Sequence, residues 1–139
     1  VNSNTLQLIE NGILKNYLVD TYNGKKLNLK SNGRSGGTTN LYFEKGNMSY
    51  EDLMKKNSRS LYITETIGHG SNIVTGDYSV GATGFLVEDG EFKYPVNEIT
   101  IAGNFKDMFK NIILANDLEF EYSVNSPTMM IEGMTVAGK

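Results

Sequence analysis

Short apolar segments separated by turn dipeptides run through most of the chain. Apolar residues flank Asn11-Gly12 in the range 6–19, and they flank Asp89-Gly90 in the range 84–96. Asn-Gly and Asp-Gly accept the positive φ values of a type I′ turn, so both places predict β-hairpins. Alternation of apolar and polar residues, or enrichment in β-branched residues, predicts further strands at 41–44, 61–67, 72–80, 99–101, 118–124 and 128–136.

Two short helices are predicted from their first residues. Asp20 can accept the exposed amide N–H groups of a first turn and begin a helix that runs through Leu27, although Gly24 within it disfavours a helix. Ser49 with Asp52 resembles a capping box, so a second helix is expected from there to about residue 57. Its inward-facing residues are expected to be Leu53 and Met54.

A third helix is expected after Gly103. Apolar residues recur there at positions i, i+3, i+4, i+7 and i+8, which lie on one side of a helix. These residues are Phe105, Met108, Phe109, Ile112 and Ile113. The range 31–40 holds three glycines without apolar periodicity and is expected to be a loop.

These elements predict an α+β fold. We expect a mostly antiparallel β-sheet that curls toward a sandwich or barrel, with two or three short helices. The 139 residues are enough for one core, and neither a repeat nor a linker divides them, so residues 1–139 are expected to form a single domain. The chain starts at Val1 rather than Met, and we therefore expect a fragment of a longer protein.

Charge and composition exclude several classes of function. The net charge is −3 and the pI is about 5.1, which argues against a general phosphate-binding surface and direct nucleic-acid binding. A local basic cluster is expected to be a solvated face; it consists of Lys25, Lys26, Lys30 and Arg34. No apolar run approaches the roughly 18 residues of a membrane span, and the absence of cysteine fits a cytoplasmic location.

The sequence offers weak candidates for catalysis. His69 is the only histidine, and one imidazole with scattered carboxylates is a poor match to a zinc site. A triad of His69, Asp77 and either Ser71 or Ser79 can be drawn, but triads are recognised by geometry rather than by spacing. An acid and base pair would need two carboxylates brought together from Glu65, Asp77, Glu88 and Asp89, of which Asp89 is better explained by its turn.

A glycine-rich segment at 75–84 is the most distinctive feature of the chain. Its glycines do not match a phosphate-binding loop. Glycines within a strand mark bulges or close backbone approach, so they can serve simply to relieve crowding in a curved sheet. If the segment has an unpaired edge, an extended peptide could pair with it through main-chain hydrogen bonds. The candidate peptide-binding residues are Thr75, Gly76, Asp77, Tyr78, Ser79, Gly81 and Gly84.

Long motifs in a fixed order resemble the C-terminal part of the PmbA/TldE branch of the TldD/PmbA family. The motifs are YLVDTYNGKKLNLKSNG at 17–33, VTGDYSVGATGF at 74–85, YPVNEITIAGNFKDM at 94–108, NDLE at 116–119 and GMTVAGK at 133–139. The resemblance covers essentially the whole chain.

The resemblance implies peptide proteolysis, in a family named for modulation of DNA gyrase. TldD and TldE form a cytosolic complex that cleaves unfolded or extended peptides, and TldD carries zinc through a His-Glu-x-x-x-His helix. This chain has no such motif and no cysteine at 122–127, where the TldD branch has one. The resemblance therefore implies no metal ligand, catalytic residue or cofactor in this chain, and zinc in a TldD-like partner.

Three hypotheses follow. In the first, the chain is a non-catalytic TldE-like domain whose partners are a TldD-like subunit and peptide substrates, with self-association as a further expectation. In the second, it is a self-sufficient hydrolase that uses Asp77 or His69. In the third, it is a regulatory module that binds gyrase or a peptide without proteolysis.

Overall fold

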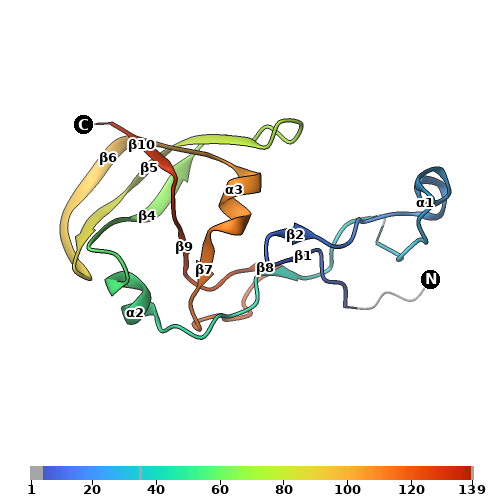
Figure 1. Ribbon diagram of the computed structural model, residues 1–139, viewed down its shortest axis with the longest axis horizontal. Coiled ribbons are helices and arrows are strands. Elements are labelled where there is room, and N and C mark those ends of the chain that lie inside the picture. Colours follow the sequence, from blue (N-terminus) through green and yellow to red (C-terminus); the bar gives the residue numbers. More distant parts are fainter. Residues whose placement is uncertain (1–4, 35, 139) are drawn as a thin grey trace. The chain divides into compact units, whose positions relative to one another are not determined.

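The computed structural model describes residues 5–34 and 36–138 and consists mainly of antiparallel strands with three short helices (Figure 1). The described residues fall into two compact units, one within Val1–Tyr42 and Phe120–Asn125 (unit 1) and one within Phe43–Glu119 and Ser126–Lys139 (unit 2). The predicted fold class is confirmed, with sheets that are not closed into a barrel. The single domain stays a prediction. None of the helices in the described ranges is long and apolar enough to cross a membrane.

Unit 1 begins with the predicted hairpin and the first predicted helix. Strands β1 (Ile9–Glu10) and β2 (Ile13–Leu14) pair across Asn11 and Gly12, whose φ values are 50° and 76°. Helix α1 (Thr21–Leu27) starts at Asp20, whose Oδ1 accepts the Asn23 amide N–H at 2.6 Å. Glycine is needed at position 24 because the Leu29 carbonyl oxygen lies so close to Gly24 that a Cβ there would collide with it.

Strands β3 (Leu41–Tyr42) and β8 (Val124–Asn125) form a short parallel pair in unit 1. The prediction of a strand over 118–124 is therefore wrong for most of its length. The buried Asn125 side chain accepts the N–H groups of Glu121 and Tyr122 at 3.0 Å each and donates to the Tyr122 carbonyl. These bonds hold the segment in a turn.

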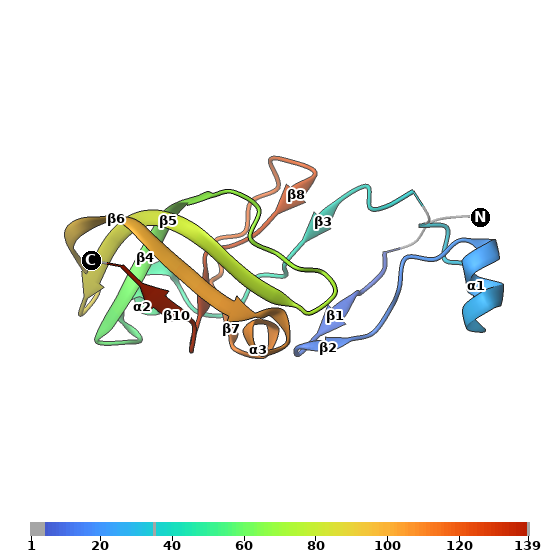
Figure 2. The same ribbon diagram turned by 90° about the horizontal axis from the view of Figure 1, so that it is seen from above.

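A four-stranded antiparallel sheet dominates unit 2, in the order β10 (Thr135–Ala137), β6 (Glu91–Asn104), β5 (Asp77–Glu88) and β4 (Arg59–Ile67), and Figure 2 shows the two long central strands from above. The predicted turn at Asp89-Gly90 is confirmed, with φ values of 52° and 84°. The predicted segments at 84–88 and 91–96 belong to the longer strands β5 and β6. Helix α2 (Tyr50–Lys55) begins at Ser49 as predicted and buries Leu53 and Met54.

The strand predicted over 72–80 begins only at Asp77, because residues 72–76 form a turn. The third helix is also shorter than predicted. Helix α3 (Phe105–Lys110) ends at Asn111, whose amide N–H and side chain bond to the carbonyls of Met108 and Asp107. Residues Ile112–Leu114 form β7, which pairs with β9 (Met129–Ile131). The apolar pair Ile112 and Ile113 thus lies on a strand, which suits β-branched residues.

Candidate functional site

A closed turn leads into the glycine-rich strand β5. The Oδ1 atom of Asn72 accepts the N–H groups of Val74 at 3.0 Å and Thr75 at 3.2 Å. The Gly76 amide donates to the Asn72 carbonyl, and the Asn72 amide donates to the Asp77 carbonyl, both at 2.8 Å. Asn72 therefore closes the turn 72–77 from both ends.

The side chain of Asn104 joins this turn to the start of α3. Its Nδ2 donates to Asp77 Oδ1 and to the Thr75 carbonyl, each at 3.1 Å. Its Oδ1 accepts the Lys106 amide N–H at 3.0 Å, which caps the helix. The Asn104 amide, followed by Thr75, lowers the pKa of the exposed Asp77 carboxyl below its ordinary value of 3.8. Asp77 is thus an ionised hydrogen-bond acceptor rather than a proton-accepting base at neutral pH.

Replacing Asn104 with serine is expected to raise the pKa of Asp77 toward 3.8. Serine keeps an oxygen that can cap α3 but removes the amide that donates to the carboxylate. NMR titration of the Asp77 carboxyl carbon measures this shift. Because the pKa is lowered in the folded chain, the associated stability is present above pH 3.8 and is lost as the pH falls through the folded value.

Thr75→Val provides a matched comparison for this titration, because Thr75 is the second and smaller cause of the lowered pKa. Its Asp77 midpoint is expected to rise less than in Asn104→Ser. A larger rise in Thr75→Val would contradict the assignment of Asn104 as the main partner.

Strand β5 has no unpaired edge. On one side β6 pairs with it from Asp77 to Glu88, and on the other side β4 pairs with it from Gly81 to Glu88. The remaining part is covered by a bridge between Ser71 and Tyr78 and by a hydrogen bond from the Ser79 amide to the Gly70 carbonyl. The condition for main-chain pairing with a peptide is therefore not met at 75–84.

Because main-chain pairing is not possible there, the seven candidate peptide-binding residues could contact a peptide only through exposed side chains. Thr75, Asp77 and Ser79 are exposed, Gly84 is buried, and the other three are of intermediate exposure, namely Gly76, Tyr78 and Gly81. Gly84 also has a packing role, because a Cβ there would collide with the Tyr62 carbonyl. The alternative interpretation, glycine as relief from crowding, thus holds at Gly84.

The structure does not assemble the catalytic triad drawn from the sequence. Ser71 and Ser79 lie on paired segments, but no hydrogen bond joins either hydroxyl or Asp77 to His69 in the described part of the chain. Asp77 is instead occupied by Asn104. The residues of the self-sufficient hydrolase hypothesis are therefore not arranged for nucleophilic catalysis.

The candidate carboxylate partners of Asp77 lie far from it along β5. Glu65 is opposite Thr83, six residues along β5 from Asp77, which is about 20 Å at the rise of a strand. Glu88 is at the other end of β5 from Asp77, at most about 36 Å along the strand by the same measure. Asp89 occupies the turn, as expected. None of these three candidates lies beside Asp77, so none of them can act with it as acid and base on one bond.

Comparison with known proteins identifies the family of the chain. A model of the PmbA/TldA metallopeptidase C-terminal domain matches residues 1–138. The chain belongs to this family. It is 44% identical over 140 residues to the metalloprotease PmbA homolog of Buchnera aphidicola subsp. Baizongia pistaciae, covering 99% of the chain and 31% of that relative.

Two further relatives bear on the branch and the fold. Identity to the metalloprotease TldD homolog of Buchnera aphidicola subsp. Acyrthosiphon pisum is 25% over 157 residues, covering 94% of the chain and 32% of the relative. A Thermotoga maritima structure described as a candidate modulator of a DNA gyrase superposes with a TM-score of 0.87 at 34% identity, covering 99% of the chain and 34% of that structure. The chain thus spans about a third of the length of these relatives.

The donor set of this PmbA/TldA-family domain does not fit a zinc ion. Zinc sites use three or four ligands, with His and Cys predominant. The sequence has one histidine and no cysteine, and no group of three His, Cys, Asp or Glu residues in the described ranges could hold a metal. No catalytic step through zinc is assigned to this domain.

A small cavity of about 230 Å³, which no sequence motif predicts, lies beside α3. Its lining comes from the end of β6, from α3 and from residues 132–135, and it includes Asn104, Asp107, Asn111, Glu132 and Met134. The hydrogen bond from Glu132 N to the Asn111 carbonyl holds two of these segments together at 3.2 Å. No local motif predicts this cavity, because segments distant in the sequence form it.

Proposed function

We propose that this chain is the C-terminal domain of a non-catalytic, TldE-like subunit in a cytoplasmic zinc metallopeptidase complex that acts on unfolded or extended peptides. The observation that supports this is the difference in identity, 44% to a PmbA homolog against 25% to a TldD homolog over nearly the same length of chain. The proposal concerns a protein about three times as long as this chain.

In the proposed complex, the zinc ion is bound by the TldD-like partner and not by this domain. The poor zinc donor set of this chain supports that assignment. The hydrogen bond from Asn104 to Asp77 supports it too, since Asp77 is one of the two residues of the self-sufficient hydrolase hypothesis. The role left to this domain is to position the peptide and stabilise the partner.

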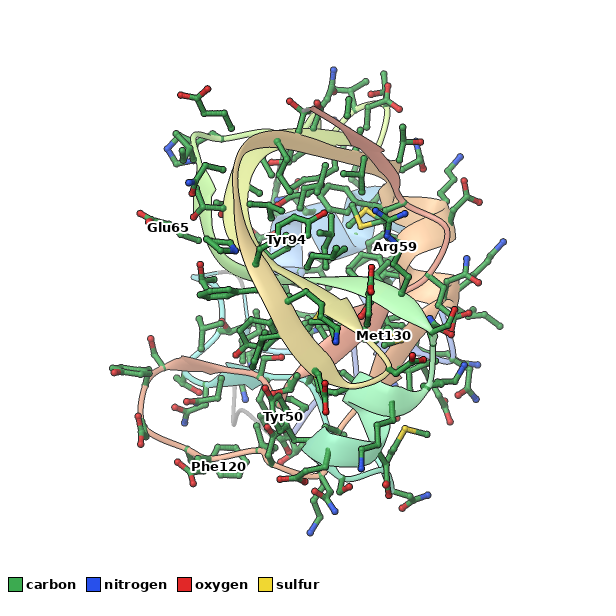
Figure 3. The ribbon with its side chains drawn as sticks, turned by 90° about the vertical axis from the view of Figure 1, so that its left-hand side faces the viewer. Tyr50, Arg59, Glu65, Tyr94, Phe120 and Met130 are labelled. Atoms are coloured by element: carbon green, nitrogen blue, oxygen red, sulfur yellow. The ribbon has the colours of Figure 1, made fainter. Side chains whose placement is uncertain are left out.

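The outer edge of β4 is the place where this domain would hold an extended peptide. β4 is the last strand in the sheet order, and among the described residues it is paired only with β5. Glu65 on this strand is exposed and projects away from the ribbon (Figure 3). A peptide added to this edge would gain main-chain hydrogen bonds that do not depend on its sequence, which suits a broad range of unfolded substrates.

An activity assay tests the proposed function. The full-length subunit that contains this domain is purified alone and together with a TldD-like partner, and each preparation is assayed for cleavage of an unstructured peptide and for zinc. We expect cleavage in the mixture and zinc with the partner, and neither in the isolated subunit. Zinc-dependent cleavage by the isolated subunit would overturn the proposal.

A second arm of this assay uses peptides N-methylated at alternate backbone nitrogens. Methylation in one register removes the N–H groups that face β4, whereas methylation in the other register leaves them intact, so only one series should lose binding. Equal cleavage of both series would exclude the edge of β4 as the peptide-binding site. It would leave the proposal that the partner binds the zinc unaffected. Stable binding to gyrase without cleavage would instead favour the regulatory module, which the description of the Thermotoga relative as a gyrase modulator supports.

A further inference from the structure

Three Asn-Gly dipeptides occur in the chain, and their surroundings differ. They are Asn11-Gly12, Asn23-Gly24 and Asn32-Gly33. An asparagine that precedes glycine is prone to deamidation, because glycine has no side chain to hinder attack by its backbone nitrogen on the asparagine Cγ. The reaction is chemically open to all three dipeptides, so the local structure decides which of them reacts.

Helix α1 protects Asn23-Gly24. The Nδ2 atom of Asn23 donates to Asp20 Oδ2 at 3.2 Å, which holds the side-chain amide. The Gly24 amide N–H, whose nitrogen would attack, donates to the Asp20 carbonyl at 2.9 Å. Reaction at Asn23 therefore requires two hydrogen bonds to break and the first turn of α1 to open.

Three hydrogen bonds protect Asn32-Gly33. The Asn32 side chain donates from Nδ2 to the Tyr17 carbonyl and accepts the Val19 amide N–H on Oδ1 at 3.3 Å. The Gly33 amide N–H donates to Ser31 Oγ at 3.4 Å. Both the group that would leave and the nitrogen that would attack are thus engaged.

Asn11-Gly12 lacks this protection. It forms the tip of the β1–β2 hairpin, and Asn11 is exposed. Among the described residues, no hydrogen bond engages the Asn11 side chain or the Gly12 amide N–H. Each strand of this hairpin is two residues long with both residues exposed, and a two-stranded hairpin on its own is marginally stable in water. The tip can therefore open at little cost in free energy.

We propose that Asn11 is a site of spontaneous deamidation, in preference to Asn23 and Asn32. The Gly12 backbone nitrogen loses its proton and forms a bond to Asn11 Cγ, and the bond from Cγ to the side-chain nitrogen breaks to release ammonia. Water then opens the resulting five-membered succinimide at one of its two carbonyls. Opening at Cγ gives aspartate, and opening at the main-chain carbonyl gives isoaspartate, in which the backbone runs through Cγ. The inference stands apart from the peptidase assignment.

The two products affect the hairpin differently. Both place a carboxylate next to the exposed Glu10, where like charges repel. Aspartate tolerates the positive φ that this turn requires, so it preserves the hairpin. Isoaspartate adds a backbone carbon between the strands, which disturbs the pairing of Ile9 with Leu14. The isoaspartyl chains therefore lose the hairpin.

Peptide mapping by mass spectrometry tests the proposal on the intact chain, incubated at physiological pH and temperature for days to weeks. Deamidation at Asn11 is expected to be on the order of a hundredfold faster than at Asn32, because each of three net hydrogen bonds is worth roughly fivefold. With two bonds at Asn23, the ratio is expected to be about twentyfold. In urea the three rates are expected to converge, because the structural protection is removed.

Asp20→Ala is the matched control, because it removes the carboxylate that holds Asn23 and caps α1. Deamidation at Asn23 is expected to accelerate about fivefold, with the rate at Asn11 unchanged. Circular dichroism verifies that the variant is folded. Equal rates at the three sites in the folded wild-type chain would overturn the proposal. A rate at Asn11 that folding slows as much as the rate at Asn32 would also overturn it.

Hydrogen exchange tests the predicted effect on the hairpin. The Lys15 amide N–H donates to the Leu8 carbonyl at 2.7 Å, beside the paired strands. It is expected to exchange faster in the purified isoaspartyl fraction than in Asn11→Asp, which carries the same charge with a normal backbone. Equal exchange in the two samples would contradict the loss of the hairpin.

Discussion

Gly84→Ala is expected to lower the free energy of unfolding by about 3 kcal/mol or more. The added Cβ would collide with the Tyr62 carbonyl oxygen and lie 3.0 Å from the Ile63 Cα. Both atoms belong to the backbone of β4, and β5 is held from its other side by β6, so neither strand can withdraw without losing its hydrogen bonds. Urea denaturation followed by circular dichroism measures the change, as a midpoint lower by about 1–2 M.

Gly81→Ala is the control for this prediction, because it makes the same change three residues earlier on the same strand. The nearest heavy atom to its Cβ would be the Ile67 Cβ at 3.7 Å, which is an ordinary contact. Its effect is expected to lie within about 1 kcal/mol of zero and to be stabilising if the reduced freedom of the unfolded chain dominates. An equally large loss at both positions would show that the Tyr62 carbonyl does not cause the effect.

Leu53→Ala is expected to destabilise the chain by about 2–5 kcal/mol, through lost apolar burial and the cavity left behind. Leu53 is 2% exposed and is one of the two largest fully buried side chains of the described residues. The measurement is again the free energy of unfolding in urea, with the slope of the transition compared to the wild type.

Leu27→Ala makes the same chemical change on another short helix, at a residue that is 58% exposed. Its effect is expected to stay within about 0.5 kcal/mol in the isolated chain, because little apolar burial is removed and alanine favours a helix. A loss at Leu27 that matches the loss at Leu53 would contradict burial as the cause of the effect at Leu53.

The turns and the helix starts of the fold could be predicted from the sequence. Asn11-Gly12 and Asp89-Gly90 both adopt positive φ values, and Asp20 and Ser49 both cap helices with their side chains. Each of these features depends on one residue and its immediate neighbours, so no knowledge of the tertiary structure is needed.

The wrong predictions share a different physical origin. Ile112 and Ile113 continue the helical period of α3, but pairing with β9 outweighs that pattern once Asn111 has ended the helix. The alternation from 118 to 124 is genuine, yet the side chain of Asn125 takes the amide groups that a strand would need. In both cases a partner outside the periodic segment decides the structure.

The candidate site could be predicted only in part. Asp77 was singled out from its surroundings in the sequence, and its pKa is indeed shifted, but in the direction of a stable carboxylate. Its partner Asn104 lies 27 residues away, and no spacing rule connects the two. The pairing of β5 on both sides could not be predicted either, because sheet order depends on long-range contacts that a single sequence does not reveal.

The double role of Asn104 has a thermodynamic consequence. Asn104 lines the cavity beside α3, and its side-chain amide holds the carboxylate of Asp77. A small molecule that entered the cavity and recruited this amide would release the carboxylate and raise its proton affinity. By reciprocity, protonation of Asp77 would free the amide for such a guest, so that occupancy would strengthen only as the pH falls below 3.8.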